Sequence, residues 1–313
     1  MWRCLVSQEQ RIYSFFNIDN KLVNEMLKAF DESIVIDVIM PIHSGMSTSN
    51  YCITVGHTNY LLKIYSGYSG NIEPILYEYL QKYIQIPKLY YYDDSRKICP
   101  YPYSIIEYIH GETLLDYVKR NRCYPAEIVF EIGRMLSIIH KKNYPMSGSI
   151  DHDLRLVNHS KNTRELIISN LEGKSGSRLS IVLHDRLREY LNNNHNIINQ
   201  IDREFVLCHG DIGYGNILMS NGIVYFIDFE YAMSESRYRD IGKFFRNKSH
   251  DVQQYISTSI YDAFANGYGG LPSNWLQLAK VADIPAMLGL LNIDTVPQDW
   301  VNDIEHDIFE VIS

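Results

Sequence analysis

Three polar side chains between residues 205 and 230 have the types and the spacing that phosphoryl transfer requires. Asp211 opens a loop after an apolar run, Asn216 follows five residues later, and Asp228 lies seventeen residues after Asp211. In phosphoryl transfer a carboxylate orients the attacking hydroxyl group, and oxygen ligands hold Mg²⁺ on the nucleotide phosphates. The segment therefore predicts a nucleotide-dependent transfer of phosphate to a hydroxyl group.

The loop with His209, Asp211 and Asn216 lies between two apolar stretches that read as strands, the second of which ends in Asp228, and the seventeen residues after Asp211 leave room for one tight hairpin. Strand alternation then places Asp228 and Glu230 on one side of this strand, and Ile227 and Phe229 on the other.

The same chemistry needs a cation on the nucleotide phosphates and a carboxylate that positions it. Lys63 lies inside an apolar strand, where an unpaired charge would be costly, and is predicted to be that cation. The helix that follows offers two carboxylates. Glu73 lies beside the apolar stripe of this helix and Glu78 on its polar side, so Glu73 is the favoured partner and Glu78 the alternative.

Hydrophobic patterning predicts an α+β protein with a small antiparallel sheet up to residue 109 and mostly helices after it. The stretch 147–180 is polar and irregular apart from a short helix near 164–170, and no catalytic or binding role is assigned to it. A cleft between the two parts is a common place for a small-molecule site. The predicted elements of the first part are a helix capped by Asn20 in a helical extension 1–32, strands 34–39, 51–55 and 59–65, a helix 71–83, and strands 88–92 and 103–108.

Composition excludes several classes of protein. The chain of 313 residues carries 29 Lys and Arg against 37 Asp and Glu, a net charge of −8, which argues against a nucleic-acid partner. Its five cysteines form no C-x-x-C pair, so neither a zinc site nor a disulfide framework is indicated. No apolar stretch approaches the roughly 20 residues that span a bilayer. We expect a cytoplasmic protein with no membrane contact and no obligate protein partner.

The sequence resembles the aminoglycoside phosphotransferases and their relatives, the choline and ethanolamine kinases. The resemblance spans roughly residues 34–270. It rests on four pieces together, namely His209-Gly210-Asp211 with Asn216 and Ile227-Asp228-Phe229-Glu230, then Arg239-Asp240-Ile241-Gly242, the helix 132–140 that ends in His140, and Phe264-Ala265-Asn266-Gly267-Tyr268.

The resemblance implies a bilobal, protein-kinase-like fold. Residues 1–109 would form the nucleotide-binding lobe, and residues 110–313 the catalytic and acceptor-binding lobe. Asp211 would accept the proton of the acceptor hydroxyl, and Asn216 and Asp228 would bind Mg²⁺. His209 and Asp240 would brace the catalytic loop by hydrogen bonds.

The resemblance also implies how the phosphate donor, ATP or GTP, is bound. The loop 44–50, with Ser47 among its hydroxyl groups, would cover the phosphates. The backbone at Glu107 and Ile109, between the lobes, would hydrogen-bond to the nucleotide base.

Three departures from protein kinases indicate a small-molecule acceptor. Gly210 replaces the arginine that pairs with a phosphorylated activation loop, Glu230 replaces the glycine of Asp-Phe-Gly, and no Ala-Pro-Glu follows.

The carboxylates Asp228, Glu230, Glu235 and Asp240 predict an acidic acceptor side, which favours a cationic, amine-bearing acceptor. An aminoglycoside-type antibiotic is the first hypothesis. A choline- or ethanolamine-type or other metabolite kinase is the alternative, and a non-catalytic nucleotide-binding module is the second alternative. Cation–π contacts with an ammonium group would come from the aromatic residues of this part of the chain, Tyr231, Tyr238, Tyr268, Trp275 and Trp300.

Overall fold

The computed structural model describes the whole chain except residues 1–10, 12, 44–46, 68–71 and 247–249. The chain packs into two compact units. The first comprises residues 1–123, 215–230 and 248–255, and the second residues 124–214, 231–247 and 256–313. The predicted boundary between residues 109 and 110 falls inside the first of these units. The assignment of a separate function to each lobe stays a prediction.

The first unit is built mainly from an antiparallel sheet of five strands in the order β1-β2-β3-β5-β4. Its elements are α1 (Asn20–Phe30), β1 (Val38–Ile42), β2 (Ser49–Val55), β3 (Thr58–Ile64), α2 (Glu73–Leu80), β4 (Leu89–Asp93), β5 (Tyr103–Glu107), β6 (Glu112–Thr113), α3 (Leu114–Asn121), β11 (Ile217–Ser220), β12 (Ile223–Phe226) and α9 (His250–Gln253).

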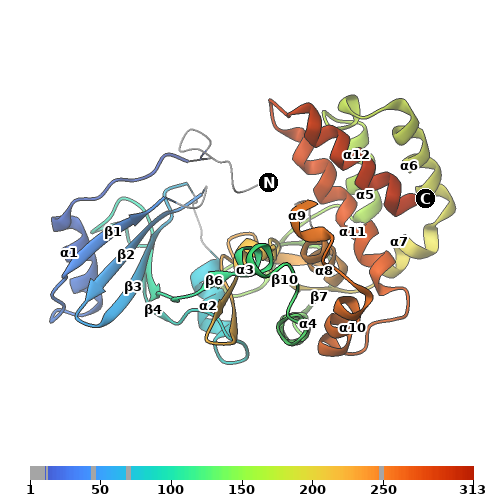
Figure 1. The fold of residues 1–313 in the computed structure, drawn as a ribbon. Coiled ribbons are helices and arrows are strands. Elements are labelled where there is room, and N and C mark those ends of the chain that lie inside the picture. Colours follow the sequence, from blue (N-terminus) through green and yellow to red (C-terminus); the bar gives the residue numbers. More distant parts are fainter. Residues whose placement is uncertain (1–10, 12, 44–46, 68–71, 247–249) are drawn as a thin grey trace. The chain divides into compact units, whose positions relative to one another are not determined.

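One face of this sheet packs against α1, drawn in blue in Figure 1. Val23 and Met26 of α1 lie in one apolar cluster with Leu62 and Ile64 of β3. Because strand side chains alternate between the two faces, Lys63 points to the opposite face. The sequence pattern of β3 therefore decides on which side of the sheet the lysine lies.

Three predictions about the N-terminal elements are wrong in detail. The cap of α1 is Asp19, whose carboxylate accepts from the N–H of Leu22 at 2.8 Å, and not Asn20. The first strand is Val38–Ile42 and not 34–39, because Ile34 turns back after α1 and is buried in the core. Residues 14–19 are not helical, so the helix of the predicted extension is limited to α1.

The first unit also contains a three-stranded sheet in the order β12-β11-β6. In the hairpin of β11 and β12, Ile217 pairs with Phe226. This register brings the residues just before β11 and just after β12 to the same end of the hairpin.

The second unit is mostly helical, as the sequence predicts. Its elements are α4 (Ala126–Ile139), β7 (Asn143–Tyr144), β8 (Gly148–Ile150), β9 (Leu156–His159), α5 (Thr163–Leu171), α6 (Ile181–Asn193), α7 (His195–Ile201), β10 (Phe205–Cys208), β13 (Met233–Ser236), α8 (Arg237–Phe245), α10 (Thr258–Tyr268), α11 (Trp275–Gly289) and α12 (Gln298–Ile312).

This unit holds a second sheet that the sequence pattern does not predict. Its order is β7-β10-β13-β8-β9, and β8 and β9 come from the stretch 147–180 that reads as irregular. These strands are only three and four residues long, too short for an alternating pattern to stand out. Among the described residues, no helix combines the length and the apolar character that crossing a membrane requires.

Helices α4 and α10 pack closely because α10 carries Gly267 at the contact. A β-carbon added at Gly267 would lie 1.9 Å from the backbone oxygen of Phe130 on α4. Only a residue without a side chain allows this approach.

We expect Gly267→Ala to lower the free energy of unfolding by about 1–3 kcal/mol, because the added methyl group must push the two helices apart. Gly289→Ala is the control, since a β-carbon there meets nothing within 4 Å. Urea unfolding of both variants measures the effect. Equal stability of Gly267→Ala and the wild type would contradict the proposed close contact.

Candidate active site

The loop that carries His209 and Asp211 follows β10 in the second unit, and one carboxylate fixes its backbone. The N–H groups of His209 and Gly210 donate to Asp240 at 2.7 and 2.9 Å. The N–H of Asp211 donates to Nδ1 of His209, which is fully buried, at 3.3 Å. Hydrogen bonds of His209 and Asp240 thus hold the loop.

Asp240 is itself held by buried side chains. Nε2 of His140 lies 3.2 Å from its carboxylate, and Nδ1 of His140 lies 2.8 Å from the Tyr268 hydroxyl. Burial by itself would raise the pKa of Asp240, but the hydrogen bonds and charges of His140 and His209 bring it below its ordinary value. Asp240 is therefore ionised at neutral pH and is a strong acceptor for the loop amides.

The glycine before Asp211 is required by the backbone. Gly210 has φ +80°, and a β-carbon there would lie 2.0 Å from the backbone oxygen of Tyr231. The position that holds arginine in protein kinases therefore cannot carry a side chain in this loop.

The carboxylate of Asp211 contacts a lysine that sequence reasoning missed. Nζ of Lys243 lies 2.8 Å from Oδ1 of Asp211, and the two side chains are 28% and 17% exposed. Lys243 comes from the last turn of α8, three residues after Asp240, so the two side chains lie on the same face of that helix.

In the first unit, Lys63 lies between two carboxylates. Its Nζ is 2.6 Å from Oε2 of Glu73 and 3.0 Å from Oδ1 of Asp228. Burial alone would lower the pKa of Lys63, but the charges of Asp228 and Glu73 raise it well above its ordinary value. Lys63 is therefore a buried cation whose charge is neutralised locally.

Glu73 receives further hydrogen bonds. The hydroxyl groups of Tyr65 and Tyr77 donate to its carboxylate at 3.2 and 2.9 Å, and the N–H of Phe229 donates at 3.1 Å. Tyr77 also accepts from the N–H of Asp228 at 3.3 Å. The carboxylate thus joins β3, α2 and the backbone after β12.

The structure separates the two candidate partners of Lys63. Helix α2 begins at Glu73 with Pro74 in its first turn, which suits proline because its missing N–H has no partner there. Glu73 is fully buried against Lys63, whereas Glu78 is exposed. The favoured contact with Glu73 is present.

Asn216 and Asp228 lie at the same end of the β11–β12 hairpin. Asn216 directly precedes β11, and the N–H of Ile227 donates to its backbone oxygen at 3.0 Å. Asn216 is 2% exposed, so its side chain is directed into the protein. An amide oxygen and a carboxylate are oxygen donors of the kind that Mg²⁺ prefers, so this donor set fits Mg²⁺.

The expected alternation of residues 227–230 is wrong. Strand β12 ends at Phe226, and Asp228 has φ +69°, a left-handed conformation that costs about 1–2 kcal/mol for a residue with a side chain. The hydrogen bonds of Glu73 and Tyr77 to this backbone hold the strained turn. Strain of this kind is characteristic of functional sites.

Ser47 and Glu230 meet in the same unit. The Ser47 hydroxyl hydrogen-bonds to Glu230, while burial and then the nearby Asp228 charge raise the pKa of Glu230 to about 7. Residues Ser44, Gly45 and Met46 of the predicted phosphate loop lie outside the described residues.

The residues predicted at the nucleotide base lie at the end of β5. Glu107 is its last residue, and its N–H donates to the Lys88 carbonyl at 2.8 Å. That N–H is therefore not available to a base. Ile109 follows in the half-buried segment before β6, which has no regular structure.

A second group of possible metal ligands lies in the other unit. Ligand atoms of His140, Cys208 and Asp240 lie within 4.8 Å of one another. Burial raises the pKa of the Cys208 thiol, so it keeps its proton, and Asp240 already accepts three hydrogen bonds. We interpret this group as the support of the loop.

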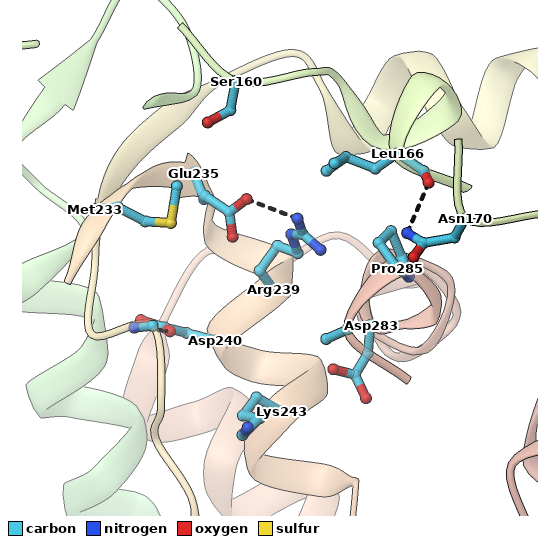
Figure 2. A pocket seen from close by; sticks show the side chains of 12 residues that line it. Ser160, Leu166, Asn170, Met233, Glu235, Arg239, Asp240, Lys243, Asp283 and Pro285 are labelled. Atoms are coloured by element: carbon cyan, nitrogen blue, oxygen red, sulfur yellow. Dashed lines mark hydrogen bonds and ion pairs between the residues drawn. The ribbon is translucent and has the colours of Figure 1, made fainter. Parts of the chain in front are cut away.

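A cavity of about 320 Å³ lies within the second unit, beside this loop. Figure 2 shows that its walls come from α5, β13, α8 and α11. Its lining residues are Ser160, Leu166, Asn170, Gly210, Met233, Glu235, Arg239, Asp240, Lys243, Asp283, Pro285 and Ala286. The volume suits a small molecule.

Most charged groups around this cavity are paired. Arg239 lies 2.7 Å from Glu235, the pair drawn with a dashed line in Figure 2, and Nε of Arg246 lies 3.1 Å from Oδ2 of Asp283. Oδ1 of Asp283 has no hydrogen-bond partner among the described residues, although Asp283 is only 2% exposed. The cavity is therefore less acidic than the sequence predicts, and the carboxylate oxygen without a partner belongs to Asp283.

The expected aromatic contacts are not part of this cavity. Its lining residues include none of Tyr231, Tyr238, Tyr268, Trp275 and Trp300. Tyr268 bonds to His140, and Trp275 stacks on Phe264 at 5.6 Å between ring centres. These two aromatic residues belong to the core of the unit.

Sequence reasoning missed Tyr77, Lys243 and Asp283. Tyr77 follows Glu73 by four residues, the spacing of neighbours on one helix face, which is a usable signal. Asp283 is an acidic residue in an otherwise apolar helix, also a usable signal. Nothing in the sequence indicates that Lys243 reaches Asp211.

Known structures share this fold. A putative aminoglycoside phosphotransferase from Ralstonia eutropha aligns with a TM-score of 0.66 and 13% identity over 95% of this chain and 98% of its own. The aminoglycoside phosphotransferase APH(4)-Ia, in complex with ADP and hygromycin B, aligns with a TM-score of 0.62 and 15% identity over 93% and 97%.

A choline kinase from Cryptosporidium parvum gives a TM-score of 0.59 and 14% identity over 94% of each chain. At such identities the likeness shows the fold, and the predicted protein-kinase-like fold is confirmed. The comparison with curated proteins found no match.

The comparison with protein families gives a more direct result. A model of the phosphotransferase enzyme family matches residues 38–281, well over half of the chain. The match includes the buried Lys63 cluster, the loop at Asp211 and the hairpin that carries Asn216 and Asp228. The chain belongs to the phosphotransferase enzyme family, as its resemblance to aminoglycoside phosphotransferases implies.

Proposed function

We propose that this protein transfers the γ-phosphate of ATP to a hydroxyl group of a small, amine-bearing molecule. The observation that carries the proposal is the buried Lys63, which lies between Glu73 and Asp228 beside the hairpin end that presents Asn216. A buried lysine, its carboxylate partner and a set of oxygen donors are the parts that bind a nucleotide triphosphate for phosphoryl transfer.

Lys63 binds the donor phosphates in this proposal. Its carboxylate partners hold the ammonium group in one place before the nucleotide arrives, so little ordering is needed on binding. The complexes of APH(4)-Ia with ADP and with AMP-PNP favour ATP over GTP as the donor here.

Asn216 and Asp228 are the proposed Mg²⁺ ligands. When bound, Mg²⁺ neutralises the charge of the donor phosphates and favours the departure of ADP. The left-handed turn at Asp228, held by Glu73 and Tyr77, fixes the carboxylate before metal binding.

Asp211 orients the acceptor hydroxyl and takes its proton. The loop bearing Asp211 is held by the buried carboxylate of Asp240, so the base keeps its place without help from substrate. Positioning of this kind supplies much of the rate acceleration in phosphoryl transfer.

The acceptor occupies the cavity lined by Asp283 and Glu235. The unpartnered Oδ1 of Asp283 suits the N–H of an ammonium group, which a primary amine offers and a quaternary ammonium does not. The lining also lacks the aromatic residues that hold quaternary ammonium groups. An aminoglycoside-type acceptor is therefore favoured over choline.

We expect Glu73→Gln to weaken ATP binding about tenfold or more and to lower the free energy of unfolding by about 3 kcal/mol, because it leaves a buried cation with one carboxylate fewer. Calorimetric titration and urea unfolding measure the two effects. Glu78→Gln is the matched control and should leave both within about 0.5 kcal/mol, since Glu78 is exposed. Wild-type affinity in Glu73→Gln would remove Glu73 from the donor site.

We expect Asp211→Asn to lower kcat by about 10²–10⁴ while ATP binding survives, because the amide cannot take the hydroxyl proton. The assay measures ADP release with ATP or GTP, Mg²⁺ and a panel of aminoglycosides, choline, ethanolamine and sugars. Asp185→Asn, at an exposed carboxylate, is the control.

Unchanged turnover in Asp211→Asn would refute its role. Binding of ATP by the wild type without transfer to any acceptor would support the alternative of a non-catalytic nucleotide-binding module.

We expect Asp283→Asn to raise the KM of primary-amine acceptors about 10- to 100-fold with little change in kcat, because a charge-assisted hydrogen bond is lost. The control is a hydroxyl acceptor of similar size without an amine, whose KM should stay constant. Steady-state kinetics and a thermal unfolding check of the variant test this. Equal losses for both acceptors would exclude Asp283 as the amine ligand.

A further inference from the structure

The ion pair between Lys243 and Asp211 has a use beyond neutralising a carboxylate. Its Nζ–Oδ1 distance is 2.8 Å, and both side chains are more than two thirds buried. Lys243 also lines the cavity. A cation therefore lies beside the proposed base and the proposed acceptor at the same time.

The backbone of the Asp211 loop is already fixed without Lys243. Asp240 holds the amides of His209 and Gly210, and the Asp211 amide bonds to His209. The ion pair of Lys243 with Asp211 is therefore not needed to hold the loop, and its presence calls for another explanation.

The charges change during phosphoryl transfer. The acceptor oxygen bonds to the γ-phosphorus, the bond from phosphorus to the ADP oxygen breaks, and the hydroxyl proton passes to Asp211. A hydroxyl oxygen that bonds to Asp211 lies within about 3 Å of its carboxylate. The transferred phosphoryl group is one bond further, within reach of a lysine that contacts the same carboxylate.

We propose, on the basis of the proposed function, that Lys243 is a catalytic residue that contacts the transferred phosphoryl group. It pairs with Asp211 before the transfer. When Asp211 takes the proton and loses its charge, the ammonium group pairs with the oxygens of the phosphoryl group. The positive charge thus stays in place while its negative partner changes, so it stabilises the transition state.

The neighbouring cations do not serve this purpose. Arg239 pairs with Glu235 on β13, and Arg246 pairs with Asp283 on α11. Lys243, in contrast, contacts Asp211. In this protein the cation beside Asp211 is therefore supplied by helix α8.

The experiment needs no acceptor, because aluminium fluoride with MgADP mimics a phosphoryl group in transfer. ADP affinity is measured by calorimetry with and without aluminium fluoride, for the wild type, Lys243→Met and Lys243→Arg. Lys174→Met, which removes an exposed lysine paired with Asp294, is the control.

We expect aluminium fluoride to tighten ADP binding in the wild type and in Lys174→Met. In Lys243→Met this tightening should fall about 10- to 100-fold, while the affinity for ADP alone is unchanged. Lys243→Arg should retain part of it because the charge is kept. Unchanged ADP affinity also shows that the variant is folded.

Full tightening in Lys243→Met would overturn the assignment of Lys243 and leave the proposed function intact. Wild-type protein that binds ADP but shows no tightening would overturn both. If the tightening of ADP binding falls as much in Lys174→Met as in Lys243→Met, the effect comes from the total charge of the protein, and the specific contact of Lys243 is overturned.

Discussion

The first unit depends on one buried carboxylate, that of Glu73. A charge removed from water is costly unless donors surround it, and here an ammonium group, two tyrosine hydroxyls and a backbone N–H do so. These donors come from β3 and the residue that follows it, from α2 and from the segment after β12. Satisfying one carboxylate therefore fixes Lys63 and the turn that carries Asp228 at once, and the removal of any donor weakens the others.

The second unit repeats the principle with a different carboxylate. Asp240 is 1% exposed and holds the amides of His209 and Gly210, while His140 fixes Asp240 from α4. In both units the buried acid is a support, and the nearby aspartate for which we propose a function, Asp211 or Asp228, is more accessible. The buried acid contributes rigidity, and the more accessible aspartate is the one that we propose to contact substrate or metal.

Charge pairing changes the expectation for the acceptor. Of the four acidic side chains expected on the acceptor side, only Glu235 and Asp240 line the cavity, and there Glu235 pairs with Arg239 and Asp240 lies buried beneath the loop. Among the residues that line the proposed acceptor cavity, Asp283 carries a buried carboxylate oxygen without a hydrogen-bond partner in the described part of the chain. Under the proposed function, this cavity selects an acceptor by the position of its amine more than by its total charge.

The sequence alone determined the parts whose signals are local. The spacing of Asp211, Asn216 and Asp228, the lysine inside strand β3 and the helical stripe beside Glu73 all follow from neighbours along the chain. The sequence also predicts the fold class and most of the long helices and strands, because their periodicity extends over several residues.

Only the tertiary structure decided what depends on contacts between distant segments. It brought Lys243 to Asp211, placed Asp283 in the cavity, gave Asp228 its left-handed turn and formed a sheet from strands too short to show a pattern. These features arise from packing and from the need to pair buried charges, and neither is encoded in the spacing of residues along one element.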